Sequence, residues 1–247
     1  TQHILGAGTG ESNLFFNVML HVGTLVAVVA FYHKLVWDLI KEFFLMLKDI
    51  FTGKFKWSKM NYNRNLVVML IIGLIPLFLL FLPIPGTDMK LKDLADLLSA
   101  SPVLIVTACS LILTSVLLTI GIIRNRKSVA STHKHLASKS NAKATRDSFN
   151  VVDAILVGVT QVCAALLPGL SRSGSTLSVG EMRGISKQKA LDYTFVLGIP
   201  SILAAALLEG VDAIKSPEGL SNIEFIPLII GMAVSAVVGY LAIVIFK

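Results

Sequence analysis

The stretch LPGLSRSGST, residues 167–176, decides how the rest of the sequence is interpreted. It combines glycines, hydroxyl side chains and a single arginine, Arg172, within a chain that is otherwise strongly apolar. Glycine lets backbone N–H groups approach a ligand closely, hydroxyl groups add rotatable donors, and a guanidinium adds a planar fork of donors. Amides of a glycine-rich turn that leads into a helix form a cradle for anions. The stretch therefore predicts a phosphate or pyrophosphate site.

The composition places this site in a membrane protein. The chain has 247 residues, of which 54% are hydrophobic and 15% are charged, whereas a soluble domain carries about 25% charged residues. The hydrophobic residues form runs long enough to cross a bilayer. We predict an all-α integral membrane fold, a polytopic helical bundle that forms a single membrane domain over residues 1–247. The expected spans are 13–32, 66–82, with a kink at Pro76, 102–123, 191–208 and 226–246.

The net charge of +7 is concentrated in particular loops. In a membrane protein such loops indicate topology, because basic loops stay in the cytoplasm. We expect the basic segments 33–65 and 124–150 to be cytoplasmic, and the segments 83–101 and 209–224 to be outside. Within 33–65 the pattern favours an amphipathic helix at the interface with membrane lipids. The same argument disfavours nucleic acid as a partner.

The segment around the quoted stretch begins and ends on the cytoplasmic side, because Arg183, Lys187 and Lys189 precede the next span. It is too short and too polar for two crossings, which need about forty apolar residues. We therefore expect a re-entrant helix–loop–helix over about 151–189 that turns near 168–173. Irregular backbone at that depth persists only where it is buried in protein or lines a wet cavity. The loop is thus predicted to be a functional site.

The run PGLSRSGST at 168–176 resembles the P-G-x-S-R-S-G-x-T signature of the undecaprenyl-diphosphate phosphatase, or bacitracin-resistance, family. The similarity extends to Asp153 and Ala154, to Gly158-x-x-Gln161, and to NVMLHVGT at 17–24, and it covers essentially the whole chain. The resemblance implies an inverted-repeat fold in which two re-entrant hairpins meet at a central pocket. It also implies a location in the bacterial plasma membrane.

The sequence departs from the family pattern at its N-terminus. The first hairpin of the family carries E/Q-x-x-x-E followed by P-x-S-S-x-x-H, and here the residues 1–3 match only its end, which places His3 on the motif histidine. We expect the chain to be truncated, with the metal-binding glutamates of the family before Thr1, so no metal ligand is assigned within it. The resemblance implies a divalent cation, Mg²⁺ or Ca²⁺, as cofactor.

The activity that the resemblance implies is hydrolysis of undecaprenyl diphosphate to undecaprenyl phosphate and phosphate. This reaction would recycle the lipid carrier of peptidoglycan and other cell-wall polymers and confer bacitracin resistance. Two alternatives stay open: a transporter or flippase for a polyprenyl phosphate, since broken helices and inverted repeats are common in transporters, and an inactive fragment of the phosphatase. A homodimer is also left open.

The resemblance assigns roles to individual residues. Arg172 would clamp the diphosphate oxygens. His3 and Ser173 are rival nucleophiles, and His3 could instead act as the acid or base that handles the leaving phosphate. The expected diphosphate-binding residues are Gly169, Ser171, Arg172, Ser173, Gly174, Thr176 and Gln161.

Each assignment has a structural alternative. Arg172 could pair with Asp153 or Glu181 as an ion pair. The hydroxyl groups of the loop could only cap the following helix, although capping does not exclude contact with phosphate. Asp153 is expected to cap the re-entrant helix, and His21 to serve packing or hydrogen bonding within a span.

Overall fold

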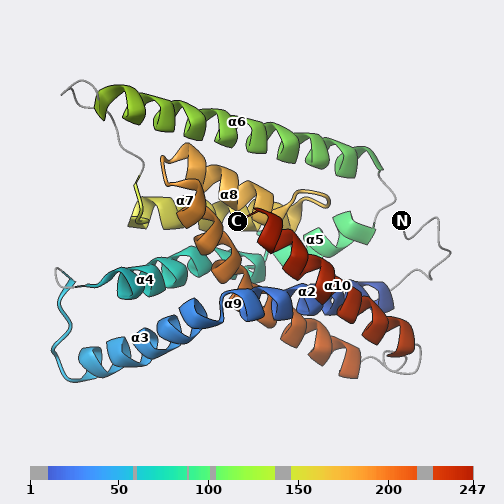
Figure 1. The fold of residues 1–247 in the computed structure, drawn as a ribbon. Coiled ribbons are helices and arrows are strands. Elements are labelled where there is room, and N and C mark those ends of the chain that lie inside the picture. Colours follow the sequence, from blue (N-terminus) through green and yellow to red (C-terminus); the bar gives the residue numbers. More distant parts are fainter. Residues whose placement is uncertain are drawn as a thin grey trace. The chain divides into compact units, whose positions relative to one another are not determined.

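The computed structural model describes residues 11–57, 60–87, 89–100, 104–136, 146–215 and 225–246. Within these ranges the chain is helical and has no β-strand beyond two isolated bridges. The elements are α2 (Glu11–Phe31), α3 (His33–Phe51), α4 (Tyr62–Leu74), the 3₁₀ helix η2 (Ile75–Phe81), α5 (Leu91–Ala100), α6 (Leu104–Leu136), α7 (Val151–Leu166), α8 (Arg172–Met182), α9 (Lys187–Lys215) and α10 (Phe225–Phe246) (Figure 1).

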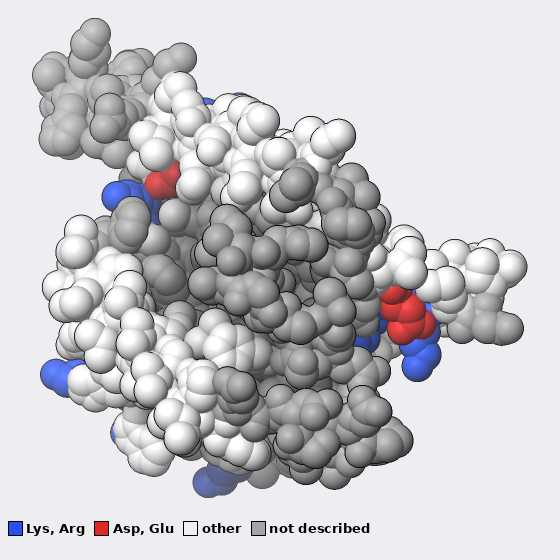
Figure 2. Space-filling model, turned by 90° about the vertical axis from the view of Figure 1, so that its right-hand side faces the viewer, with Lys and Arg blue, Asp and Glu red and all other residues white. Residues whose placement is uncertain are grey.

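Several of these helices have the length and composition of membrane spans. Four qualify in the described part of the chain, at Tyr62–Phe81, Ile105–Asn125, Lys187–Leu208 and Phe225–Ile245, and there are up to five if α2 and α3 form one broken span. The described surface in Figure 2 agrees, since it is mostly uncharged and its charged groups gather in a few small clusters. The prediction of an all-α polytopic membrane protein is confirmed.

The chain divides into two compact units, residues 1–37 with 196–247, and residues 38–195. In the first unit α2 packs against α10 through small residues. A Cβ atom at Gly23 would collide with the backbone of Met232, and Ser235 Oγ donates to the Leu20 carbonyl at 2.9 Å. Small side chains let apolar helices approach closely where no hydrophobic effect drives them together. The single domain over 1–247 stays a prediction.

The core of the second unit joins α4 to the start of α9. Tyr193 is fully buried, and its hydroxyl donates to the Met69 carbonyl at 2.7 Å. Its ring stacks on Phe149 with centroids 3.9 Å apart, and Asn65 Nδ2 donates to the Phe149 carbonyl at 3.2 Å. These contacts fix the residues before α7 against α4.

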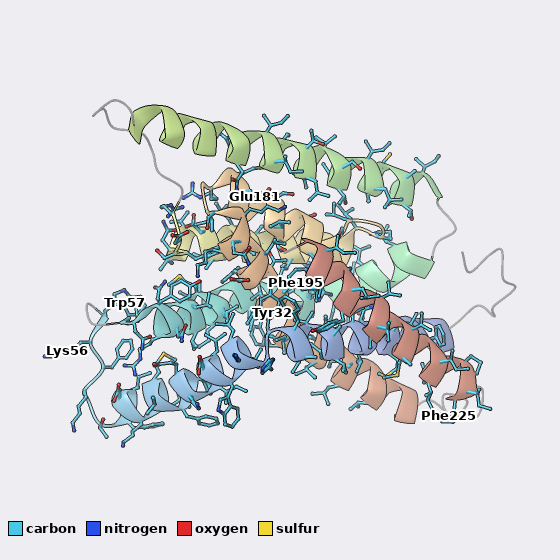
Figure 3. All side chains as sticks on the ribbon, viewed as in Figure 1. Tyr32, Lys56, Trp57, Glu181, Phe195 and Phe225 are labelled. Atoms are coloured by element: carbon cyan, nitrogen blue, oxygen red, sulfur yellow. The ribbon has the colours of Figure 1, made fainter. Side chains whose placement is uncertain are left out.

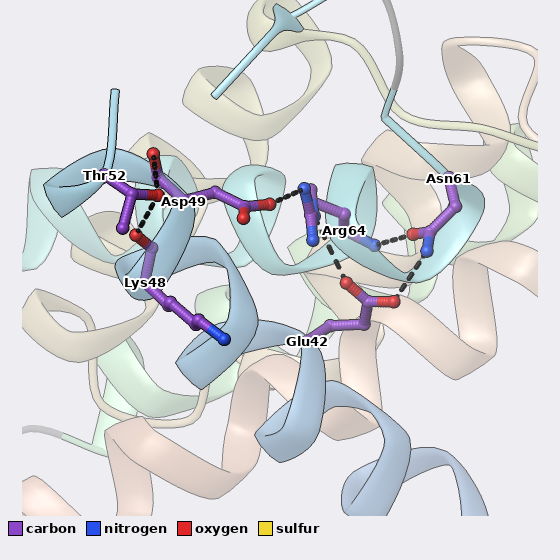
Figure 4. Close-up of polar contacts among 6 residues, drawn as sticks. All are labelled: Glu42, Lys48, Asp49, Thr52, Asn61 and Arg64. Carbon is purple, nitrogen blue, oxygen red and sulfur yellow. Dashed lines mark hydrogen bonds and ion pairs between the residues drawn. The ribbon is translucent and has the colours of Figure 1, made fainter. Parts of the chain in front are cut away.

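The α3–α4 connection of the second unit is closed by a polar cluster (Figure 4). Arg64 pairs through Nε with Glu42 at 3.2 Å and through Nη1 with Asp49 at 2.7 Å. Asn61 Nδ2 donates to Glu42 at 2.6 Å, while its Oδ1 accepts the Arg64 N–H and caps α4. The predicted amphipathic helix forms as α3, in which Leu39 and Met46 are buried whereas Lys34, Lys41 and Lys48 are exposed. Its place at the membrane interface stays a prediction.

The span that contains α4 changes helix type at the predicted position. α4 ends at Leu74, and the chain continues as η2 with Pro76 in its first turn. Proline lacks the N–H that an α-helix needs and clashes with the preceding turn. Helix α7 crosses here: a Cβ atom at Gly158 would lie 2.6 Å from the Gly73 carbonyl oxygen and 2.7 Å from Pro76 Cγ.

Replacing Gly158 with alanine should therefore destabilise the protein. The neighbouring groups are backbone and a rigid ring, so the helices must separate, and overpacking of this kind costs about 1–3 kcal/mol. The matched control is Gly210→Ala in α9, where a Cβ atom would meet nothing within 4 Å. We expect a lower melting temperature in detergent for Gly158→Ala and an unchanged or higher one for Gly210→Ala. Equal melting temperatures for the two variants would contradict the close packing.

Two loops expected from the sequence are partly helical. Residues 83–101 were expected to be a loop, but 91–100 form α5, which begins where the Asp93 carboxylate accepts the Lys90 N–H at 2.7 Å. The basic segment 124–150 was expected to be a loop, but α6 continues to Leu136. The added turns include arginine, lysine and alanine, which are good helix formers.

Candidate anion-binding hairpin

Helices α7 and α8 form a hairpin whose two ends meet. Arg183, just after α8, donates through Nε to Asp153 Oδ1 in the first turn of α7 at 2.7 Å. The helices have 16 and 11 residues, which correspond to about 24 and 17 Å and are shorter than a membrane core of about 30 Å. The structure confirms the predicted helix–loop–helix, with its turn at 167–171. Its re-entrant course in the membrane stays a prediction.

Asp153 closes the base of this hairpin. It is fully buried, and its Oδ2 atom pairs with Arg146 Nη2 at 2.9 Å while Oδ1 binds Arg183. Asp153 also forms a capping box with Asn150, because each side chain accepts the backbone N–H of the other residue. The predicted cap is confirmed. Since Arg172 begins α8 at the turn, Asp153 and Arg172 lie at opposite ends of the hairpin.

The turn depends on one glycine and one serine. Gly169 has φ +88, a left-handed conformation that glycine adopts without strain. A Cβ atom there would lie 2.9 Å from Thr107 Cγ2 of α6. Ser171 is the N-cap of α8, and its Oγ accepts the Gly174 N–H at 3.1 Å. The structure thus confirms that Ser171 caps the helix that begins at Arg172.

The first turn of α8 has the features of an anion site. Arg172 and Ser173 occupy its first two helical positions, where backbone N–H groups have no carbonyl partner inside the helix. These groups carry the positive end of the helix dipole. Ser173 is exposed and Arg172 is half-buried. The roles of Gly169, Ser171, Arg172, Ser173 and Gly174 in binding a diphosphate stay predictions.

Two of the predicted binding residues are engaged in helix contacts instead. Thr176 is buried, and its hydroxyl donates to the carbonyls of Arg172 at 2.9 Å and Ser173 at 3.2 Å. Gln161 is 1% exposed, and its Nε2 donates to the Gly73 carbonyl of α4 at 3.1 Å. Their contact with substrate stays a prediction. His3 lies outside the described residues.

The structure adds residues that the sequence did not single out. Ser175 is fully buried next to the anion-binding turn, and within the described chain its hydroxyl has no hydrogen-bond partner. Thr114 of α6 accepts the Ser171 N–H at 3.1 Å. Thr114 lies in the middle of an apolar span, so only a three-dimensional structure could show that it meets the turn.

The described residues suit an anion better than a metal ion. Nowhere in the described ranges do three His, Cys, Asp or Glu side chains come together in a way that could hold a metal. The turn instead presents a guanidinium, a hydroxyl and helix N–H groups, which are donors. The divalent cation implied by the family resemblance stays a prediction, and no metal ligand is assigned here.

Glu181 sits at the far end of α8 and faces α6 (Figure 3). It is 3% exposed, and its Oε2 lies 2.9 Å from the position that a Cβ atom would take at Gly121. Burial raises the pKa of its carboxyl above the ordinary value, and the charge of Lys187 opposes that shift. The folded state therefore favours the protonated form of Glu181.

A glutamine at position 181 should raise stability at neutral pH. Because the folded pKa of Glu181 is raised, the protein is most stable when this group is protonated and loses stability as pH rises through the folded pKa. We expect Glu181→Gln to melt above the wild type at pH 7.5, and the difference to shrink at pH 4.5. Glu42→Gln, which loses the ion pair with Arg64, should melt lower at pH 7.5. A lower melting temperature for Glu181→Gln would contradict the raised pKa.

Comparison with known proteins adds a second line of argument. A family model described as "Bacitracin resistance protein BacA" matches residues 1–247. The chain is 30% identical to an undecaprenyl-diphosphatase of Bacteroides thetaiotaomicron over 94% of its own length and 74% of the relative. It is 33% identical to one of Alkaliphilus metalliredigens over 98% and 78%, and 30% identical to one of Corynebacterium glutamicum over 96% and 69%.

Proposed function

Because the chain belongs to the bacitracin resistance protein BacA family, we propose that it hydrolyses undecaprenyl diphosphate to undecaprenyl phosphate and phosphate. Relatives that bear the name undecaprenyl-diphosphatase match almost the whole chain. The observation that carries the proposal is the hairpin turn, in which Arg172 and Ser173 open a serine-capped helix inside a membrane protein. A diphosphate is the group that this set of donors recognises.

In the proposed reaction the terminal phosphoryl group is transferred to water. An oxygen–phosphorus bond to water forms, the bridging bond to the lipid phosphate breaks, and the two products are undecaprenyl phosphate and inorganic phosphate. Arg172 holds two non-bridging oxygens with its planar fork. The first amides of α8 stabilise the charge that shifts to the leaving oxygen, and such donors act strongly where water is excluded.

Two residues are proposed for the chemical step. Ser173 is exposed at the second position of α8, where a phosphoserine formed on it would lie against the helix N-terminus before water releases the phosphate. His3 is the rival nucleophile, or the group that carries the proton. Phosphopeptide analysis after parallel acid and alkaline quenches separates the two routes, because phosphoserine survives acid whereas phosphohistidine survives only the alkaline quench.

A divalent cation is also proposed, from the family resemblance. When bound, it would offset the negative charge of the diphosphate. The described residues hold no cluster for the cation, so the roles proposed above belong to this chain's own side chains. We further propose that the protein works in the bacterial plasma membrane, where hydrolysis recycles the cell-wall lipid carrier and gives bacitracin resistance. A homodimer stays a prediction.

The proposal is tested with the full-length protein in vesicles that contain a long-chain prenyl diphosphate. Phosphate release and movement of the lipid between leaflets are followed in the same sample, with and without a chelator of divalent cations. We expect release of phosphate that stops on chelation. Lipid movement without phosphate release would support the transporter alternative, and neither signal would support an inactive protein.

A further inference from the structure

Thr114 lies in the middle of α6, and its hydroxyl group both donates one hydrogen bond and accepts another. Its Oγ1 donates to the Ser110 carbonyl one turn earlier at 3.0 Å and accepts the Ser171 N–H at 3.1 Å. The side chain is 8% exposed. The Thr114 hydroxyl proton points to the Ser110 carbonyl, which leaves the oxygen lone pairs free to accept, and one of them accepts the Ser171 N–H.

The residue that Thr114 holds is the one that begins α8. Ser171 is the N-cap, and its own hydroxyl accepts the Gly174 N–H. The Cγ2 methyl group of Thr114 also lies close to Gly174, since a Cβ atom added at Gly174 would lie 3.3 Å from it. The threonine thus contacts the residues on either side of Arg172 and Ser173 and fixes where those two begin the helix.

Thr114 belongs to one face of α6 that follows the hairpin from its turn to its base. Thr107 meets Gly169, and seven residues after Thr114 a Cβ atom at Gly121 would lie 3.1 Å from Ser178 Cα. A further turn on, Asn125 Nδ2 donates to the Ile185 carbonyl at 3.3 Å. Seven residues are about two helical turns, so these side chains share one face of α6, which runs parallel to α8.

We propose that Thr114 is a positioning residue for the anion-binding turn, which it holds through the Ser171 amide so that Arg172 and Ser173 face the diphosphate. The inference rests on the proposed function for its catalytic consequence, while the placement of the turn does not depend on it. Thr114 touches no substrate. Its loss leaves the partly buried Ser171 N–H without its acceptor. An unpaired donor away from water is costly, so the turn moves.

The test compares Thr114→Ser with Thr114→Ala, which differ only in the hydroxyl group, and adds Thr114→Val as the closest match in shape. The control is Thr119→Val on the same helix. Thr119 makes the same kind of bond, to the Ser115 carbonyl at 2.8 Å, but its side chain is exposed. Two quantities are measured on the full-length protein: deuterium exchange of the amides in 167–176 without substrate, and kcat and KM for phosphate release from a prenyl diphosphate.

We expect Thr114→Ala and Thr114→Val to speed exchange in 167–176 and to lower kcat about tenfold or more, as loss of a buried hydrogen bond predicts. Thr114→Ser and Thr119→Val should stay within about twofold of the wild type in kcat. Wild-type exchange in Thr114→Ala would overturn the inference, as would equal effects of Thr119→Val and Thr114→Val. Altered exchange in a protein that releases no phosphate would refute the proposed function and keep the positioning role.

Discussion

Replacing Arg172 with alanine should reduce phosphate release from a prenyl diphosphate by about 100-fold or more, the effect of removing one major donor to a transition state. Arg172→Lys should lose a similar factor, although it keeps the charge. The reason is geometric: the guanidinium binds two oxygens through a planar fork, whereas an ammonium group is a point charge. The measurement is the initial rate of phosphate release at saturating substrate, compared between each variant and the wild type.

The control for this prediction is Arg124→Ala. Arg124 is exposed on α6 and also carries a positive charge, but it lies outside the hairpin turn. It should keep the wild-type rate. All three variants should melt within a few degrees of the wild type, which separates lost chemistry from lost folding. A rate for Arg172→Ala above about a tenth of the wild-type rate would show that the guanidinium is not the main diphosphate ligand.

Replacing Asp153 with alanine should cause the largest loss of stability of any substitution considered. The change removes the Asp153 half of the capping box, which is the bond from the Asn150 N–H to the carboxylate, and both ion pairs that join the base of the hairpin. Loss of a capping hydrogen bond costs about 1 kcal/mol. The arginine partners are more than a third exposed, so each pair adds only a fraction of the cost of a buried one. We expect a total of about 2–3 kcal/mol, measured as a lower melting temperature in detergent.

A second substitution at position 153 separates the loss of the capping bond from the loss of the charge, and a neighbouring carboxylate provides the control. Asp153→Asn keeps a side-chain oxygen for the Asn150 N–H but loses the charge that binds Arg146 and Arg183, so it should show about half the loss. The control Asp147→Ala removes an exposed carboxylate that accepts the Ser186 hydroxyl at 2.8 Å. It should melt close to the wild type. If Asp153→Ala has the same melting temperature as Asp147→Ala, the base of the hairpin does not depend on Asp153.

The features of the fold that depend on local composition could be predicted from the sequence. Long apolar runs located the spans, and the basic residues at each end of 151–189 predicted that the two ends of this segment lie together, as the Arg183–Asp153 ion pair confirms. Asp153 could be expected to cap α7 because acidic residues suit the first turn of a helix. The change of helix type at Pro76 followed from the missing N–H of proline.

Features that depend on contacts between distant segments could not be predicted. The Thr114–Ser171 bond joins residues 57 positions apart, and a threonine within an apolar span has no local signal that marks such a partner. Gln161 is predicted to contact the diphosphate because of its place in the family pattern, but no local signal indicated the bond from its amide to the Gly73 carbonyl 88 positions away. The helix α5 was not predicted because its mixture of charged residues is typical of a loop. In the structure its first turn is stabilised by the Asp93 carboxylate, which accepts the Lys90 N–H.

We claim above all that the diphosphate binds at the hairpin turn between α7 and α8. Deuterium exchange with a non-hydrolysable prenyl bisphosphonate tests that claim most directly, because it reports binding without chemistry. The predicted result is slower exchange of the amides in 167–176 when the bisphosphonate is added, no such change in Arg172→Ala, and no change in α10. Protection confined to other segments, or unchanged exchange at saturating bisphosphonate, would contradict the claim.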